Sequence, residues 1–339
     1  MNKSLKKLIQ NDSKIQYFTG EKEIIKQGLT PLLAEKNNSI IIQKANLLEH
    51  SKYLNWQKKG KQLIETLNFN SIEFLIFKGF AYTFLIYDES HFRPYSDIDV
   101  FIKEKNYDKV EQLLNELGYK KLPSRQGKFI SFQNSFYNNQ KPTTTIDLHW
   151  QINNRIELHK HFEFNRVYRN SIHLKQPNFK TLNQIDAFIL ACFHYQAHRP
   201  EDRKHIWLYD LALLWNKMDD KTQSQCLQAS KKKALTHILN AILIQLNNTF
   251  KNSINVNLEQ LDYSKNSQDY LINRNRKISD IRLRLKNIHG IRNKIKYLSE
   301  YIFQKKVYVK ERFKVKSNVW IYAYYPRMWI EDLIKLFKS

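Results

Sequence analysis

Three aspartates of the 339-residue chain stand where predicted strands would bring carboxylates together. Asp97 and Asp99 are two residues apart in an apolar strand predicted over 96–102, so both side chains point to the same face. Adjacent carboxylates repel each other unless a cation lies between them, and carboxylate oxygens suit Mg²⁺. Asp147 lies in another strand, predicted over 143–150. If these strands were neighbours, three carboxylates would be available for a two-metal phosphoryl transfer.

A glycine and two basic residues fit the same chemistry. Gly79 follows a short apolar strand predicted over 72–77 and begins a predicted helix. At such a turn the backbone comes close to phosphate oxygens, and the helix N-terminus adds N–H donors. Lys78 and Arg93 supply positive charge for a triphosphate. We therefore expect these three residues to contact a nucleotide.

Three histidines belong to the candidate site. His149 lies two residues after Asp147 and faces the same side of its strand. His194 and His198 are four residues apart in a predicted helix, hence on one face. Either this pair contributes to a nucleotide site, or it forms a polar helix edge or satisfied core imidazoles. A helical two-histidine zinc site is a third reading, although no Glu follows His194 as the metalloprotease motif requires.

The elements that must position these residues form a small α/β unit. Between about 69 and 152 the order is strand, helix, strand, helix, strand, strand, while the flanking sequence has helical periodicity. We expect an α+β fold with a mixed-sheet core and helical N-terminal and C-terminal regions. The predicted segments are a helical region over 1–68, the core over 69–152, a helical domain completing the cleft over 153–250, and a basic helical region over 251–339.

Several motifs in order resemble a known family. They are Phe-Lys-Gly at 77–79, Arg-Pro-Tyr-Ser-Asp-Ile-Asp at 93–99, Leu-Gly-Tyr at 117–119, Ile-Asp-Leu-His-Trp at 146–150, His-Tyr-Gln-Ala-His at 194–198 and Leu-Tyr-Asp at 208–210. Together they resemble the uncharacterised nucleotidyltransferase family of the DNA polymerase β-like superfamily, over about residues 70–215. The superfamily usually has Gly-Ser or Gly-Gly after the first strand. Here the motif is Lys78-Gly79-Phe80, so the serine side chain that would contact phosphate is missing.

The resemblance implies a minimal nucleotidyltransferase core that moves a nucleoside monophosphate from a nucleoside triphosphate, such as ATP, to a hydroxyl group. It implies that Asp97, Asp99 and Asp147 hold Mg²⁺ or Mn²⁺, and that Asp147 helps to deprotonate the acceptor. Nucleotide contacts are expected from Lys78, Gly79, Arg93, His149, His194 and His198. The acceptor stays open between a protein, a small molecule and RNA, and so does the oligomeric state.

Charge supports an alternative. The chain has 56 Lys and Arg against 32 Asp and Glu, a net charge of +24, which favours polyanionic partners. The run 274–316 contains 15 basic and 3 acidic residues. These are either the solvated faces of amphipathic helices or a surface for RNA. The alternative function is therefore a catalytically degenerate protein of the same fold that binds RNA or another polyanion.

Other classes are excluded by missing motifs. Two cysteines cannot form a disulfide framework or a Cys-based zinc module. The chain has no Walker A loop, no dinucleotide-binding glycine motif and no His-Arg-Asp kinase loop. No secretory signal or spanning segment is evident, so we expect a cytoplasmic protein. The aromatic stretch 319–330 either packs on the protein's own core or docks on a membrane surface.

Overall fold

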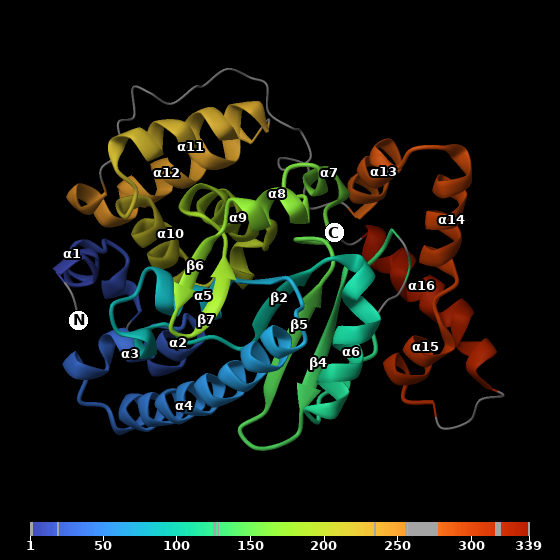
Figure 1. The fold of residues 1–339 in the computed structure, drawn as a ribbon, viewed down its shortest axis with the longest axis horizontal. Coiled ribbons are helices and arrows are strands. Elements are labelled where there is room, and N and C mark those ends of the chain that lie inside the picture. The colour runs from blue at the N-terminus through green and yellow to red at the C-terminus, as the bar shows by residue number, and fades with distance from the viewer. Residues whose placement is uncertain are drawn as a thin grey trace. The chain divides into compact units, whose positions relative to one another are not determined.

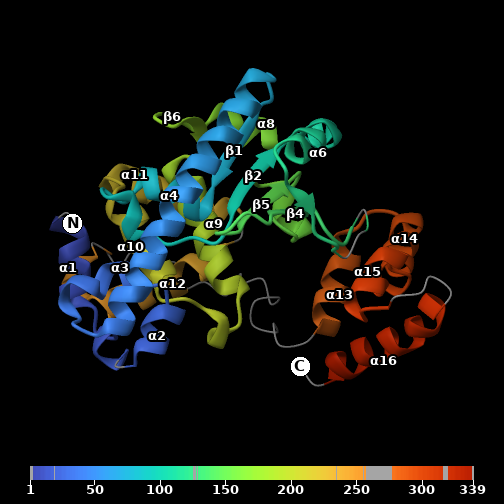
Figure 2. The same cartoon turned by 90° about the horizontal axis from the view of Figure 1, so that it is seen from below.

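The structure, a computed structural model, describes residues 3–18, 20–124, 127, 129–233, 235–254, 256, 277–315 and 320–337. Figures 1 and 2 follow the chain from its blue N-terminal helices to its red C-terminal helices. The chain divides into two compact units. The first holds Met1–Val100, Asn139–Thr145 and Asn165–Ser267, and the second holds Phe101–Asn138, Ile146–Phe164 and Gln268–Ser339. From the basic run 274–316, residues 274–276 and 316 lie outside the described residues.

Five strands form one sheet in the order β1–β2–β5–β4–β3 (Figure 1). They are β1 (Phe74–Phe77), β2 (Ile98–Ile102), β3 (Lys120–Lys121), β4 (Gln133–Asn138) and β5 (Thr144–His149). β1 and β2 are buried along their whole length, as expected of continuous apolar runs. β4 alternates half-buried and buried positions, and β3 pairs with it antiparallel. This sheet among many helices confirms the predicted α+β class.

The first unit contains most of the helices. They are α1 (Lys3–Asn11), α2 (Glu21–Lys26), α3 (Thr30–Leu33), α4 (Ile40–Phe69), α5 (Lys78–Leu85), α8 (Phe164–Arg169), α9 (Gln184–Ala197), α10 (Ile206–Asn216), α11 (Asp220–Lys232) and α12 (Thr236–Phe250). α4 begins at Ser39, whose side chain accepts hydrogen bonds from the backbone of Ile41 and Ile42. α9 begins in the same way at Asn183, which caps the backbone of Asp186.

α10 is a deeply buried helix of a bundle within this unit. Nine of its eleven residues are buried, because its sequence is apolar on every side apart from Asp210. α9 packs against α10, α11 and α12, while α1 packs on α10 and α12 (Figure 1). Asp12 accepts a hydrogen bond from the hydroxyl of Tyr209 at 2.9 Å and lies 2.6 Å from Nε2 of His205. These buried contacts tie the N-terminal segment to α10.

A hairpin lies in the stretch that the sequence analysis treated as helical. β6 (Ile172–Lys175) pairs antiparallel with β7 (Asn178–Thr181), and β7 packs beside β1. The helical expectation for 153–250 did not include it. Each strand has four residues, which is too short for a period-two pattern to stand out from the surrounding helical pattern.

The second unit contains α6 (Tyr107–Glu116), α7 (Ile156–His159), α13 (Lys277–Asn287), α14 (Ile291–Ile302), α15 (Lys306–Arg312) and α16 (Tyr324–Phe337). α13 contacts α7, and Arg284 of α13 donates to the carbonyl oxygens of Phe129 and Ile130 at 3.0 and 3.3 Å. The C-terminal helices have a core of their own, formed by Val309, Val315, Ile321 and Met328. Within the part of the chain that the structure describes, no helix is long and apolar enough to cross a membrane.

Candidate active site

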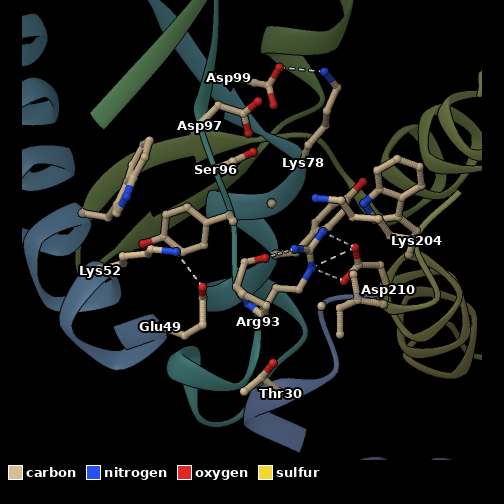
Figure 3. Close-up of a pocket in the computed structure, with 18 of the residues that line it drawn as sticks. Thr30, Glu49, Lys52, Lys78, Arg93, Ser96, Asp97, Asp99, Lys204 and Asp210 are labelled. Carbon is tan, nitrogen blue, oxygen red and sulfur yellow. Dashed lines mark hydrogen bonds and ion pairs between the residues drawn. The ribbon is translucent and has the colours of Figure 1, made fainter. Parts of the chain in front are cut away.

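A cavity of about 510 Å³ in the first unit contains the Asp97–Asp99 pair. Asp99 lies in β2 and is 4% exposed, whereas Asp97 is half-buried and directly precedes the strand. The strand therefore begins two residues later than predicted, yet both side chains line the cavity. Figure 3 shows them projecting from the same stretch of backbone, with Lys78 beside Asp99. The cavity thus has an acidic end.

Lys78 and Gly79 line this cavity at the start of α5. Nζ of Lys78 lies 2.6 Å from Oδ1 of Asp99, and the side chain of Lys78 is 22% exposed. The backbone of Lys78 is left-handed, with φ of 57°, a conformation that is uncommon for a residue other than glycine. A Cβ atom on Gly79 would lie 3.0 Å from Cβ of Tyr95, so glycine allows the segment before β2 to approach α5 closely.

Arg93 forms a buried ion pair that orders this segment. Its Nε and Nη2 donate to the two carboxylate oxygens of Asp210 in α10, at 2.7 and 2.6 Å. The hydroxyl of Tyr87 also donates to Asp210, at 2.9 Å. Burial disfavours the charge of Arg93, but the neighbouring Asp210 carboxylate raises its pKa, so the guanidinium stays charged. Arg93 lines the cavity, and its predicted contact with a triphosphate remains a prediction.

Three rings stand together on another wall of the same cavity. The rings of His194, His198 and Trp207 lie 4.6 to 4.9 Å apart between centroids. His194 lies in α9, whereas His198 is the residue just after that helix, in an extended conformation. Burial lowers the pKa of His194 well below its usual value, and the nearby Lys78 and His198 add to this effect. The imidazole of His194 is therefore neutral at physiological pH.

Asp147 and His149 lie in β5, the strand next to β2 in the sheet. Oδ1 of Asp147 accepts a hydrogen bond from the hydroxyl of Ser135 at 2.6 Å, and its Oδ2 accepts one from Nε2 of Gln133 at 3.3 Å. Asp147 and His149 both belong to the second unit. Carboxylates and imidazole are ligands for divalent cations, and the predicted metal ligation by Asp147 and nucleotide contact by His149 stay predictions.

The structure thus brings most of the predicted site residues together in one cavity. They are Lys78, Gly79, Arg93, Asp97, Asp99, His194 and His198. Asp147 and His149, in the second unit, are not among the residues that line it. Sequence reasoning missed several lining residues, namely Lys26, Lys52, Trp56, Tyr95, Lys204 and Trp207. No short motif marks them, because they come from separate helices and loops.

An acidic pair at the start of a buried strand, beside a lysine–glycine turn into a helix, is the arrangement that the resemblance to nucleotidyltransferases implied. The family comparison agrees with this assignment. The chain belongs to the uncharacterised nucleotidyltransferase family, whose model matches residues 26–251. This confirms the resemblance found in the sequence.

The chain is also similar to a solved structure, the crystal structure of an antigenic nucleotidyltransferase-like protein from Paracoccidioides brasiliensis. The match covers 59% of this chain and 94% of the Paracoccidioides chain, with 14% sequence identity and a TM-score of 0.36. No curated protein matches the chain in sequence.

Proposed function

We propose that this protein is a Mg²⁺- or Mn²⁺-dependent nucleotidyltransferase that moves a nucleoside monophosphate from a nucleoside triphosphate to an acceptor hydroxyl. The observation that carries the proposal is the acidic end of the cavity, where Asp97 and Asp99 lie with Lys78 and Gly79. The ammonium of Lys78 pairs with Asp99 in this structure, so a metal ion that binds Asp99 would displace it and leave Lys78 available to the triphosphate. Carboxylate oxygens such as those of Asp97 and Asp99 are suitable ligands for Mg²⁺ or Mn²⁺.

In the proposed reaction, the acceptor oxygen forms a bond to the α-phosphorus of the triphosphate. The bond between that phosphorus and the oxygen that bridges to the β-phosphate breaks, and pyrophosphate leaves. The acceptor proton passes to a carboxylate oxygen of Asp147, which Ser135 and Gln133 hold in place. A divalent cation held by Asp97, Asp99 and Asp147 would neutralise charge on the reacting phosphate. Lys78 binds the triphosphate, and the backbone at Gly79 leaves room for it.

We assign the nucleoside to the part of the cavity wall that is formed by the rings of two histidines and a tryptophan. His194, His198 and Trp207 present flat, largely apolar rings, on which a nucleobase stacks. Because His194 is neutral, it offers a hydrogen bond to a base without adding charge. The cavity of about 510 Å³ is within the range of small-molecule sites.

A labelling experiment tests the proposal. Wild-type protein is incubated with each α-³²P-labelled nucleoside triphosphate, Mg²⁺ or Mn²⁺, and extract from the source cells, and transferred label and intact-mass adducts are recorded. Asp97→Asn and Asp99→Asn should each reduce transfer by about 100-fold or more. Asp88→Asn, which changes an exposed carboxylate, is the matched control and should keep full transfer.

Two results would count against the proposal. One is that wild type transfers no label from any triphosphate with either metal. The other is label transfer that is equal in wild type and in the Asp97→Asn and Asp99→Asn variants. The mass of an adduct identifies the acceptor as a protein, a small molecule or RNA.

A further inference from the structure

Helix α14 turns an apolar stripe towards solvent. Ile291, Ile295, Leu298 and Ile302 are 70%, 60%, 38% and 41% exposed, and their spacing of four, three and four residues places them on one side of the helix. A helix of a globular protein normally buries such a stripe and exposes its polar face. In α14 the buried residue is Tyr297, on a different side.

Two more exposed apolar residues follow α14 in the chain. Phe303 and Val307 are 63% and 61% exposed. The ring of Phe303 lies 5.7 Å from that of Trp329 in α16, and the indole of Trp329 donates to the carbonyl oxygen of Ile302 at 2.8 Å. These contacts hold the end of the stripe in place. We call the exposed set Ile291, Ile295, Leu298, Ile302, Phe303 and Val307 the α14 face.

Positive charge surrounds the α14 face. At helical spacing, Arg292 and Lys296 flank the stripe on one side and Lys294 flanks it on the other. Described residues 277–315 and 320–337 contain fourteen Lys and Arg against five Asp and Glu. Two of these acids, Glu331 and Asp332, are already paired with Arg312. The surroundings of the face are therefore strongly cationic.

The exposed aliphatic side chains and the positive charge around them together favour one kind of partner. An RNA would use the basic residues, but aliphatic side chains contribute little to binding phosphates or bases. A second copy joined through the same face would place like charges opposite each other. An anionic bilayer uses both features, because aliphatic side chains enter the boundary between headgroups and acyl chains while Lys and Arg meet lipid phosphates.

We propose that the α14 face docks the protein on the surface of an anionic membrane, with α14 lying in the plane of the headgroups. Trp320 and Tyr322, which are 67% and 60% exposed in the same C-terminal region, have the amphipathic rings that favour the membrane interface. This inference does not depend on the proposed nucleotidyl transfer. It assigns a function to the basic C-terminal helices, whose residues do not line the cavity.

Flotation with vesicles tests the inference on the full chain. The protein should float with vesicles in which about a third of the lipid is phosphatidylglycerol, should not float with pure phosphatidylcholine, and should be released by high salt. Ile295→Asp/Leu298→Asp should reduce the bound fraction about tenfold or more. The matched control is Leu47→Asp/Leu48→Asp, which makes the same change at exposed leucines of α4 and should bind as wild type does.

Charge reversal provides an independent variant. Arg292→Glu/Lys296→Glu changes only exposed positions and should also reduce flotation with the anionic vesicles. Circular dichroism at matched concentration shows whether each variant is folded.

Three outcomes would overturn the inference. The first is failure of the wild type to float with anionic vesicles, and the second is equal flotation of all folded variants. The third is a wild-type dimer that Ile295→Asp/Leu298→Asp converts to a monomer without loss of flotation, which would assign the α14 face to a second copy. A loss of RNA retention with unchanged flotation would likewise assign it to RNA.

Discussion

The ammonium of Lys78 lies 2.6 Å from a carboxylate oxygen of Asp99, at the acidic end of the cavity. For a residue with a Cβ atom, the left-handed backbone conformation of Lys78 is less favourable than a right-handed one by about 1 kcal/mol or more. This strained conformation occurs at the turn between β1 and α5, where the side chain of Lys78 contacts Asp99. A metal ion that binds Asp99 must compete with this ammonium.

Replacing Lys78 should separate metal binding from transfer. In Lys78→Met, Asp99 loses a competing cation, so Mn²⁺ should bind about fivefold more tightly by calorimetry, as expected for a partly exposed ion pair. Nucleotide transfer should fall by more than tenfold, because the triphosphate loses a positive charge. Lys61→Met removes a lysine of α4 that is 73% exposed and should change neither quantity. Weaker Mn²⁺ binding in folded Lys78→Met would contradict the competition.

The Arg93–Asp210 pair should matter for stability. Asp210→Asn leaves the buried guanidinium without its carboxylate partner and should lower the free energy of unfolding by about 3–5 kcal/mol in urea titrations. The double variant Arg93→Met/Asp210→Leu removes both charges and should recover part of that loss. A double variant that is no more stable than Asp210→Asn would show that the two charges are not coupled as the structure indicates.

Gly79 should resist even a single added methyl group. In Gly79→Ala the new Cβ atom would press on Tyr95, so we expect stability to fall by about 1 kcal/mol and the KM for the nucleotide to rise. Gly20→Ala is the control, since a Cβ atom there would meet no atom within 4 Å. That variant should stay within about 0.5 kcal/mol of wild type. Equal behaviour of the two variants would show that the approach of Tyr95 to Gly79 is unimportant.

Acid should destabilise the second unit through His159. Burial, chiefly, lowers the pKa of this imidazole to about 4, and its Nε2 lies 2.9 Å from the carbonyl oxygen of Asn153. Because the unfolded chain takes up this proton near pH 6.5, it binds more protons than the folded state between pH 6.5 and 4. The free energy of unfolding should therefore fall as the pH decreases through that window.

The comparison is made between pH 7.5 and 5.5. In His159→Gln the side chain at this position does not titrate. Between pH 7.5 and 5.5 its free energy of unfolding should therefore fall by about 1 kcal/mol less than that of wild type. Urea unfolding of both proteins at the two pH values measures this difference. An identical loss in both proteins would mean that His159 does not contribute to the acid sensitivity.

Much of the site's local structure could be predicted from the sequence. The apolar runs of β1 and β2, the helix after Lys78 and the period-two spacing of Asp97 and Asp99 are patterns of neighbouring residues. Such patterns depend on short-range geometry, which the sequence contains in full. The motifs that run in order along the chain were also sufficient to identify the family, which the family model confirms.

Only the tertiary structure decided which distant groups meet. The sequence predicts that Arg93 binds phosphate groups, and in the fold it pairs with Asp210, 117 residues further along the chain. Lys78, for which phosphate binding is also predicted, pairs with Asp99. No periodicity links Arg93 to Asp210, or the rings of His194 and Trp207. Their meeting depends on how the helices of the bundle pack, and packing is set by the whole core rather than by any local stretch of sequence.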